Sequence, residues 1–151
     1  MLNGEQRDFD CEPTRRLLDL LRGDAGLTGV KEGCGQGECG ACSILLGDRL
    51  VNSCMVAVGQ VADRPITTIE GYSRTTRFAV LRDAFGKAGA VQCGFCTPGM
   101  IMACEALLRQ NNRPRAPEIR LALAGNLCRC TGYNMIVDAV ETAAREGKGL
   151  W

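Results

Sequence analysis

Cysteines are the residues of this sequence best suited to chemistry: it has ten of them and no histidine. Three lie close together in the spacing Cys34-x4-Cys39-x2-Cys42, and Cys54 follows further along the chain. This order of three close cysteines and a distant fourth is the plant-type [2Fe–2S] ligand spacing. The first half of the chain therefore predicts an iron–sulfur site.

Two further pairs, Cys93-x2-Cys96 and Cys128-x-Cys130, complete a second set of four. Two sites of four cysteines suit either iron–sulfur clusters or structural zinc. Zinc ribbons favour two short Cys-x2-Cys hooks, whereas the first group here is a glycine-rich loop. Glycine permits positive φ and brings N–H groups close to sulfur. The first group thus favours an iron–sulfur cluster. The spacing of the second group alone also fits zinc, but the presence of the first group makes an iron–sulfur cluster the better interpretation there too.

Composition excludes several functions. The 151 residues hold 18 Lys and Arg against 17 Asp and Glu, so the net charge is +1. A chain with this charge balance has no excess of basic residues that would bind nucleic acid or a membrane surface. No apolar run approaches the roughly 18 residues of a membrane span. The absence of histidine excludes Ser-His and Cys-His dyads and Rieske-type ligation within this chain.

Disulfides are the alternative use of so many cysteines. They are typical of small secreted domains, but residues 1–8 show no basic segment followed by an apolar stretch. We therefore expect reduced thiols and a cytoplasmic location. Cys104 falls on an apolar helical stripe and is predicted to be a buried core residue. Cys11 has no predicted role.

The first half of the chain predicts a small mixed sheet with one helix across it, of the β-grasp kind. A helix is expected from Pro13 to Gly23, with leucines on one side. Strands at 43–46 and 49–52 flank a Gly47-Asp48 turn, and residues 65–69 are rich in β-forming types. A domain boundary is expected between residues 70 and 76, where Gly, Ser, Arg and Thr gather.

The second half predicts helices. Apolar residues recur with helical spacing from Pro98 to Leu108 and from Tyr133 to Ala144. Further helices are expected at 78–87 and 119–123. These elements form two helix pairs, each of which presents a loop with two cysteines. Packing of the two loops against each other would build the second cluster site.

Three segments carry a family resemblance: residues 33–42 (GCGQGECGAC), 92–100 (QCGFCTPGM) and 125–133 (GNLCRCTGY). Together they resemble the small iron–sulfur subunit, or N-terminal region, of the xanthine oxidase family of molybdenum hydroxylases. The resemblance covers nearly the whole chain, and all eight ligand positions match. In the family the first strand begins several residues before the position of Met1, so we expect either a weakened sheet edge or a truncated start.

The resemblance implies an α+β fold with a cluster in each of two domains. Residues 1–74 would form a ferredoxin-like β-grasp domain that holds the outer [2Fe–2S] cluster through Cys34, Cys39, Cys42 and Cys54. Residues 75–151 would form a four-helix domain that holds the inner [2Fe–2S] cluster through Cys93, Cys96, Cys128 and Cys130.

The resemblance also implies partners. The inner cluster would lie beside the pterin of a molybdenum cofactor, with Gln92 hydrogen-bonded to the pterin and Cys130 as the ligand closest to it. Single electrons would pass from a molybdopterin-binding large subunit, through both clusters, toward FAD on a medium subunit. The expected assembly is a dimer of such heterotrimers, with no substrate site on this chain.

Alternatives remain open for both the substrate and the class of function. Residues 131–137 (TGYNMIV) look closest to xanthine or purine dehydrogenase subunits, which makes xanthine or purine hydroxylation the leading expectation. Relatives that act on nicotinate, other N-heterocycles, aldehydes, carbon monoxide or aromatic acyl-CoA carry nearly the same motifs. A zinc-stabilised interaction module and a free-standing ferredoxin are the rivals from other classes.

Overall fold

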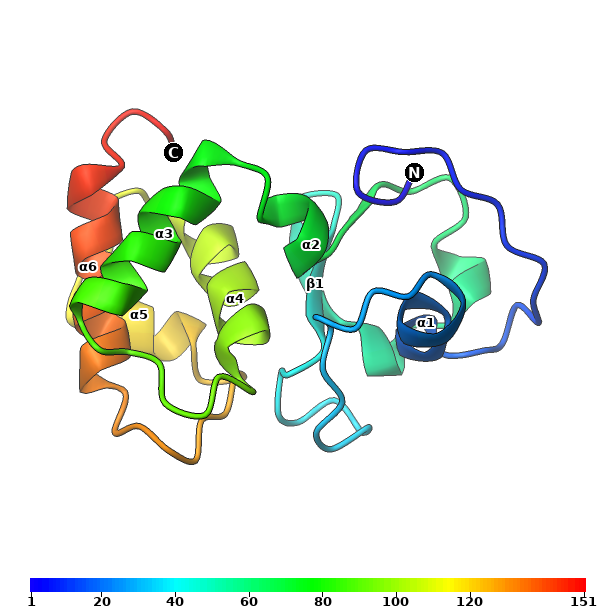
Figure 1. Ribbon diagram of the computed structural model, residues 1–151, viewed down its shortest axis with the longest axis horizontal. Coiled ribbons are helices and arrows are strands. Elements are labelled where there is room, and N and C mark those ends of the chain that lie inside the picture. Colours follow the sequence, from blue (N-terminus) through cyan, green and yellow to red (C-terminus); the bar gives the residue numbers. More distant parts are fainter.

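Strand β1 (Ser43–Leu46) occupies the middle of the computed structural model, which describes residues 1–151 (Figure 1). It pairs antiparallel with β2 (Arg49–Asn52) and with β3 (Ile66–Thr67), in the order β2-β1-β3. The turn between β1 and β2 contains Gly47 with φ +63°, a conformation that glycine adopts without steric cost. The predicted hairpin around Gly47-Asp48 is therefore confirmed.

Both faces of β1 are buried, and this places the strand between two cores. Successive side chains of a strand point to opposite faces. Ile44 and Leu46 accordingly pack in an N-terminal cluster with the leucines of α1 (Leu17–Asp19). Leu45, between them, packs in a larger cluster formed by the helices of the second half. The sheet thus joins the two halves of the chain through a shared strand.

The N-terminal helix starts later than predicted. Arg16 has extended backbone and forms a bridge with Ala57, so the helical turn α1 begins only at Leu17. The chain then widens into a π-helical turn, Leu20–Asp24, closed by the Ala25 N–H donating to the Leu20 carbonyl. The prediction of a helix from Pro13 was wrong at its start, because local tertiary pairing overrides the helix signal there.

The β-rich segment 65–69 is also shorter as a strand than predicted. Only Ile66–Thr67 pair with β1, and Ile69 already belongs to the short helix α2 (Ile69–Tyr72). On its other edge β3 receives the chain start, since Leu2 bridges to Ile66 in parallel and the Asn3 N–H donates to the Ile66 carbonyl at 2.8 Å. The edge is thus covered by a bridge rather than by a full strand.

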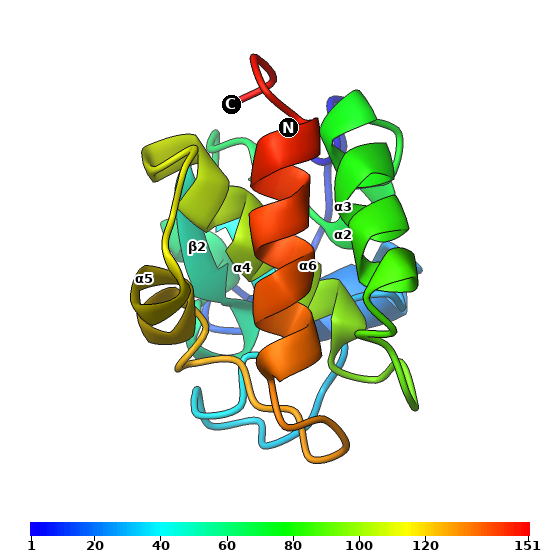
Figure 2. The ribbon, with the colours of Figure 1, turned by 90° about the vertical axis from the view of Figure 1, so that its left-hand side faces the viewer.

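Four longer helices build the second half: α3 (Thr76–Lys87), α4 (Thr97–Gln110), α5 (Ala116–Ala122) and α6 (Asn134–Glu146). All four lie where the sequence predicted helices, which confirms the α+β class. Figure 2 shows α6 in front, with α3 and α5 on either side and α4 behind. None of the helices is both long and apolar enough to cross a membrane.

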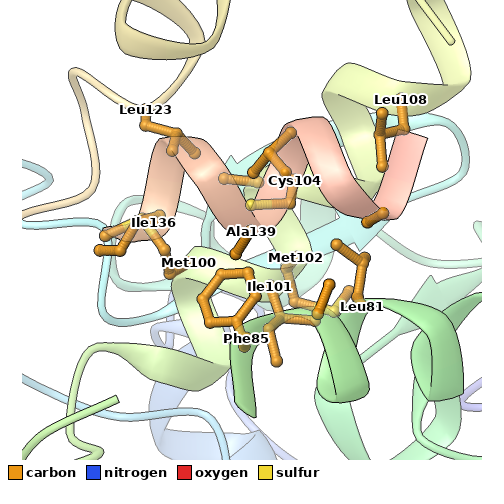
Figure 3. Packing of buried hydrophobic residues seen from close by; sticks show 14 of the residues in the cluster. Leu81, Phe85, Met100, Ile101, Met102, Cys104, Leu108, Leu123, Ile136 and Ala139 are labelled. Atoms are coloured by element: carbon orange, nitrogen blue, oxygen red, sulfur yellow. The ribbon is translucent and has the colours of Figure 1, made fainter. Parts of the chain in front are cut away.

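Helix α4 is the centre of the helical core. Its residues from Gly99 to Ala106 are all buried, and Phe85 of α3 and Ile136 of α6 pack in the same cluster (Figure 3). Cys104 is fully buried there, as predicted for a core residue.

Glu105 is the one charged residue in this core, and it links five segments of the chain. Its Oε2 accepts from Tyr72 Oη at 2.6 Å and from Trp151 Nε1 at 2.7 Å. Its Oε1 accepts from Arg77 Nη1 at 2.9 Å and from Arg109 Nε at 2.6 Å. Arg109 also reaches Asp48 in the β1–β2 turn at 2.9 Å. Buried charges of this kind persist only when each lone pair is satisfied.

The Glu105 carboxylate is strongly held in its charged form. Burial alone would raise its pKa, but the hydrogen bonds from Tyr72, Trp151 and Arg109 and the charge of Arg109 together lower it. A carboxyl group with a lowered folded-state pKa stabilises the fold above its unfolded pKa. That stabilisation is lost as the pH falls through the folded value.

We predict that Glu105→Gln lowers the free energy of unfolding by about 3 kcal/mol at pH 7, because four donors lose a charged acceptor. The difference from the wild type should begin to shrink below the ordinary glutamate pKa of about 4.3, where Glu105 of the unfolded chain becomes protonated, and should disappear as the pH falls through the lower pKa of folded Glu105. Urea unfolding of both proteins between pH 3.5 and pH 7 measures this. A difference that does not change with pH would contradict the assignment of a charged Glu105.

Candidate metal centres

The cysteine-bearing loops lie at one end of the molecule, the lower end in Figures 1 and 2. The first loop precedes β1, the second leads from α3 into α4, and the third connects α5 to α6. The helix pairs thus present their cysteine loops on the same side, as the sequence predicted.

The first loop is shaped to surround negatively charged sulfur. Gly35 and Gly37 have positive φ, which turns successive N–H groups inward. The Cys34 Sγ accepts from the N–H groups of Gln36, Glu38 and Cys39 at 3.3 to 3.4 Å, and the Cys39 Sγ accepts from the Cys34 N–H at 3.3 Å. These hydrogen bonds, led by that of Gln36, lower the pKa of Cys34 to about 7. The loop therefore favours a thiolate, which is the form that binds metal.

Strand pairing brings Cys42 and Cys54 to the same place. Ser43 lies opposite Asn52 at the open end of the hairpin, so Cys42 just before β1 and Cys54 just after β2 become neighbours. The Ser53 N–H donates to the Cys42 carbonyl at 3.2 Å. Both thiols are buried, and burial together with the neighbouring Cys42 raises the pKa of Cys54 to about 11.

The second set of cysteines comes together across two loops. The Sγ atoms of Cys93 and Cys130 lie 3.5 Å apart, although 37 positions separate them in the chain. Cys96 faces Cys128, and burial with this contact raises the pKa of Cys96 to about 12. Burial opposes ionisation of Cys128 as well, but hydrogen-bond donors of Thr131 and Cys130 outweigh it, and the pKa of Cys128 falls to about 7.

The arrangement of sulfurs fits a two-iron cluster better than a single ion. Within residues 1–151 no three or more cysteines or carboxylates converge on one ion position. Each iron of a [2Fe–2S] cluster needs only two protein sulfurs, so four ligands surround a wider space than a zinc ion does. Pairs of close sulfurs within each group of four match that requirement.

The loops of the two groups contact each other directly. The Leu127 N–H donates to the Cys39 carbonyl at 2.9 Å, which joins the residue before Cys128 to a cysteine of the first group. The Asn126 Nδ2 donates to the Gly40 carbonyl at 3.0 Å and to Ser43 Oγ at 3.1 Å. Asn126 is buried, and no pattern in the sequence marks it as a contact between the two groups.

Tyr133 holds the third loop from its other side. Its hydroxyl accepts from the Cys128 N–H at 2.7 Å and donates to the Asn126 carbonyl at 3.2 Å. Its backbone is left-handed, with φ +67°, and it caps α6 rather than belonging to the helix. Such a conformation is unfavourable for a bulky residue and persists only where the surroundings impose it. The last helix thus begins one residue later than predicted, at Asn134, while Tyr133 still packs against the helical core.

Gln92 lies beside Cys93 on an exposed part of the second loop. Its side-chain amide makes no hydrogen bond to any other residue of the chain. The nearby Val91 and Phe95 are 45% and 48% exposed, so apolar surface flanks this loop. The amide is thus available to a group outside this chain.

An α+β protein with a cysteine group in each half belongs to the class of two-cluster [2Fe–2S] proteins. Two family models match the chain: "2Fe-2S iron-sulfur cluster binding domain" over residues 1–72 and "[2Fe-2S] binding domain" over residues 68–141. Together they span both cysteine groups.

Individual relatives identify the family within this class of proteins. The chain is 51% identical to the nicotinate dehydrogenase small FeS subunit of Eubacterium barkeri, covering 94% of this chain and 90% of that protein. It is 45% identical to a probable xanthine dehydrogenase subunit of Bacillus subtilis (strain 168), covering 98% and 85%. The crystal structure of quinoline 2-oxidoreductase from Pseudomonas putida 86 has a chain that superimposes with a TM-score of 0.89 at 43% identity, covering 97% and 93%. The chain belongs to the small iron–sulfur subunits of the xanthine oxidase family of molybdenum hydroxylases.

Membership decides between the open alternatives. The chain is an electron-transfer subunit of a multi-subunit oxidoreductase and carries [2Fe–2S] clusters. The expected fold, a ferredoxin-like β-grasp domain followed by a four-helix iron–sulfur domain, is confirmed. The zinc module and the free-standing ferredoxin are excluded as descriptions of this protein.

We predict that Gly99→Ala destabilises the chain by about 2 kcal/mol, because it overpacks the contact between the two halves. A Cβ at this position would lie 2.3 Å from the Gly40 carbonyl oxygen, which belongs to the first cysteine loop. Gly86→Ala is the matched control: this exposed glycine of α3 has open space around it. It should gain up to about 1 kcal/mol of helix propensity. Thermal unfolding measures both, and equal effects would contradict a steric origin.

Proposed function

We propose that Cys34, Cys39, Cys42 and Cys54 hold the outer [2Fe–2S] cluster, and that Cys93, Cys96, Cys128 and Cys130 hold the inner one. On this assignment residues 1–74 and 75–151 each carry one cluster. The close sulfur pairs and the inward N–H groups of the first loop support it. Cys11 and Cys104 remain outside both groups.

The chain then relays electrons one at a time between two partner subunits. When bound, each [2Fe–2S] cluster supplies a site that accepts and releases a single electron. The observation that carries the proposal is the 2.9 Å hydrogen bond from the Leu127 N–H to the Cys39 carbonyl. It connects a ligand of one group to the neighbour of a ligand of the other, so the two sites communicate through one short contact.

The direction of the relay follows from the surroundings of the sulfurs. Cys93 and Cys130 are exposed, and the exposed Gln92 and Phe95 beside them suit contact with a molybdopterin-binding large subunit. Gln92 would hydrogen-bond the pterin, with Cys130 as the nearest ligand. The outer group would face FAD on a medium subunit. Its backbone N–H···S bonds favour a more positive potential there, which draws electrons outward.

The partners follow from the same exposed surface. Apolar side chains beside a cluster must be covered in the working enzyme, which supports a heterotrimer with the large and medium subunits, assembled as a dimer. All ten thiols are free of disulfides, which fits a reducing compartment such as the cytoplasm.

The proposed reaction of the complex is hydroxylation of a nitrogen heterocycle, with xanthine or another purine as the specific expectation and nicotinate as the alternative. The relatives named above act, by their names, on nicotinate, xanthine and quinoline. Each of them has a subunit similar to this chain although their substrates differ, which supports placing the substrate pocket on another chain. Assay of the purified complex with xanthine and with nicotinate distinguishes the two.

We predict about four iron atoms and four labile sulfides per chain in the purified complex, with two distinct spin-resonance signals after reduction. Cys39→Ala should abolish the outer signal and halve the iron, because it removes one ligand and disturbs the loop that donates to Cys34. Cys11→Ala, the matched control, should retain both signals. Two retained signals in Cys39→Ala would refute the ligand assignment.

We predict that Gln92→Ala slows reduction of the inner cluster by substrate while leaving iron content and both signals intact. The amide makes no contact within the chain, so its loss should not disturb the fold. Rapid-freeze spin resonance after mixing with substrate measures the rate of reduction. An unchanged rate would remove Gln92 from the pterin contact.

A further inference from the structure

One buried polar group of the chain lacks a partner. The Thr131 Oγ1 is inaccessible to solvent and makes no hydrogen bond, and it is the only buried side-chain nitrogen or oxygen of residues 1–151 in this position. Leaving such a hydroxyl unpaired costs about 1–3 kcal/mol. Buried polar groups without a partner in the protein are rare and point to a missing acceptor.

The place of this hydroxyl identifies the acceptor. Thr131 directly follows Cys130, and its N–H donates to the Cys128 Sγ at 3.4 Å. Because only Cα and Cβ separate the backbone nitrogen of Thr131 from its hydroxyl, this sulfur also lies close to the hydroxyl. No oxygen, nitrogen or sulfur of the chain receives this donor, so its acceptor is one that the chain alone does not complete.

The loop around Thr131 is held in place on two sides. On one side the Tyr133 hydroxyl binds both the Cys128 N–H and the Asn126 carbonyl. On the other side Asn126 is bound to Gly40 and Ser43 of the first half. Residues 126–133 are thus anchored at both ends, which holds the backbone of Thr131 next to Cys128.

A neutral thiol is a weak acceptor, whereas a metal-bound thiolate carries negative charge and accepts more strongly. The orphaned hydroxyl is therefore matched to Cys128 as a ligand rather than as a free thiol. A hydrogen bond to a ligand sulfur stabilises the reduced, more negative cluster and so raises its reduction potential.

We propose that the Thr131 hydroxyl donates a hydrogen bond to the Cys128 sulfur of the inner cluster and sets that cluster's reduction potential. This inference rests on the proposed assignment of Cys128 as an inner-cluster ligand. It assigns Thr131 a role in electron transfer, because the potential of the inner cluster decides how readily it accepts an electron from the partner subunit.

The test compares Thr131→Val with Thr131→Ser in the assembled complex. Valine keeps the shape but removes the donor, and serine keeps the donor but removes the methyl group. We expect Thr131→Val to make the oxidised-to-reduced ratio of the inner cluster about tenfold larger at a given potential. This corresponds to a reduction potential that is more negative by about 59 mV. Serine should titrate like the wild type, and the outer cluster should be unchanged in both.

Redox titration followed by spin resonance gives both potentials, with the inner signal identified as the one that Cys96→Ser alters. An unchanged inner potential in Thr131→Val overturns the inference, as does an equal shift in the valine and serine variants. If valine fails to load the inner cluster, Thr131→Ala, which cannot clash, replaces it. Loss of inner-cluster iron in valine and alanine but not serine supports the inference, and loss in all three overturns it.

The same experiments distinguish failure of this inference from failure of the proposed function. A wild-type complex that lacks two [2Fe–2S] signals would refute the function itself. Two normal signals with a potential insensitive to the Thr131 hydroxyl would refute only this inference.

Discussion

The contact between the first and third cysteine loops is the constraint on which the rest of the structure depends. The Leu127 N–H, the Asn126 amide and the close approach of Gly40 to the Gly125 carbonyl hold the two loops together. The glycine contact tolerates no extra volume, since a Cβ on Gly40 would lie 2.4 Å from the Gly125 carbonyl oxygen. A relay of single electrons needs its two sites at a fixed short separation. Here that separation is set by backbone hydrogen bonds rather than by a flexible linker.

Two further features serve the same constraint from a distance. Strand β1 is buried on both faces, so Leu45 ties the sheet to the helical core while Ile44 and Leu46 belong to the N-terminal core. Glu105 adds a charged junction, in which α2, α3, α4 and the C-terminal Trp151 converge on one carboxylate. The halves are thus joined by a strand, a buried ion pair network and the loop contact. Relative motion of the two cluster sites would have to break all three.

The environments of the two cysteine groups differ in a way that suits a subunit between two partners. The outer group is folded into its own loop and hairpin, with backbone donors around Cys34 and with Cys42 and Cys54 buried. The inner group has Cys93 and Cys130 exposed, with half-exposed apolar neighbours at Val91 and Phe95. One group is therefore enclosed within the chain, while the other opens onto its surface.

The sequence by itself determined the chemistry and the element order: eight cysteines in family spacing, the helices, the hairpin and the burial of Cys104. These features depend on local spacing and periodicity, which a linear sequence displays directly. Tertiary structure alone decided the late start of α1, the short β3, the capping role of Tyr133, the buried hub at Glu105 and the pairing of Leu127 with Cys39. Each of these depends on residues far apart in the chain. Arg16 pairs with Ala57, Glu105 with Tyr72 and Trp151, and Asn126 with Gly40, and no spacing rule encodes such encounters.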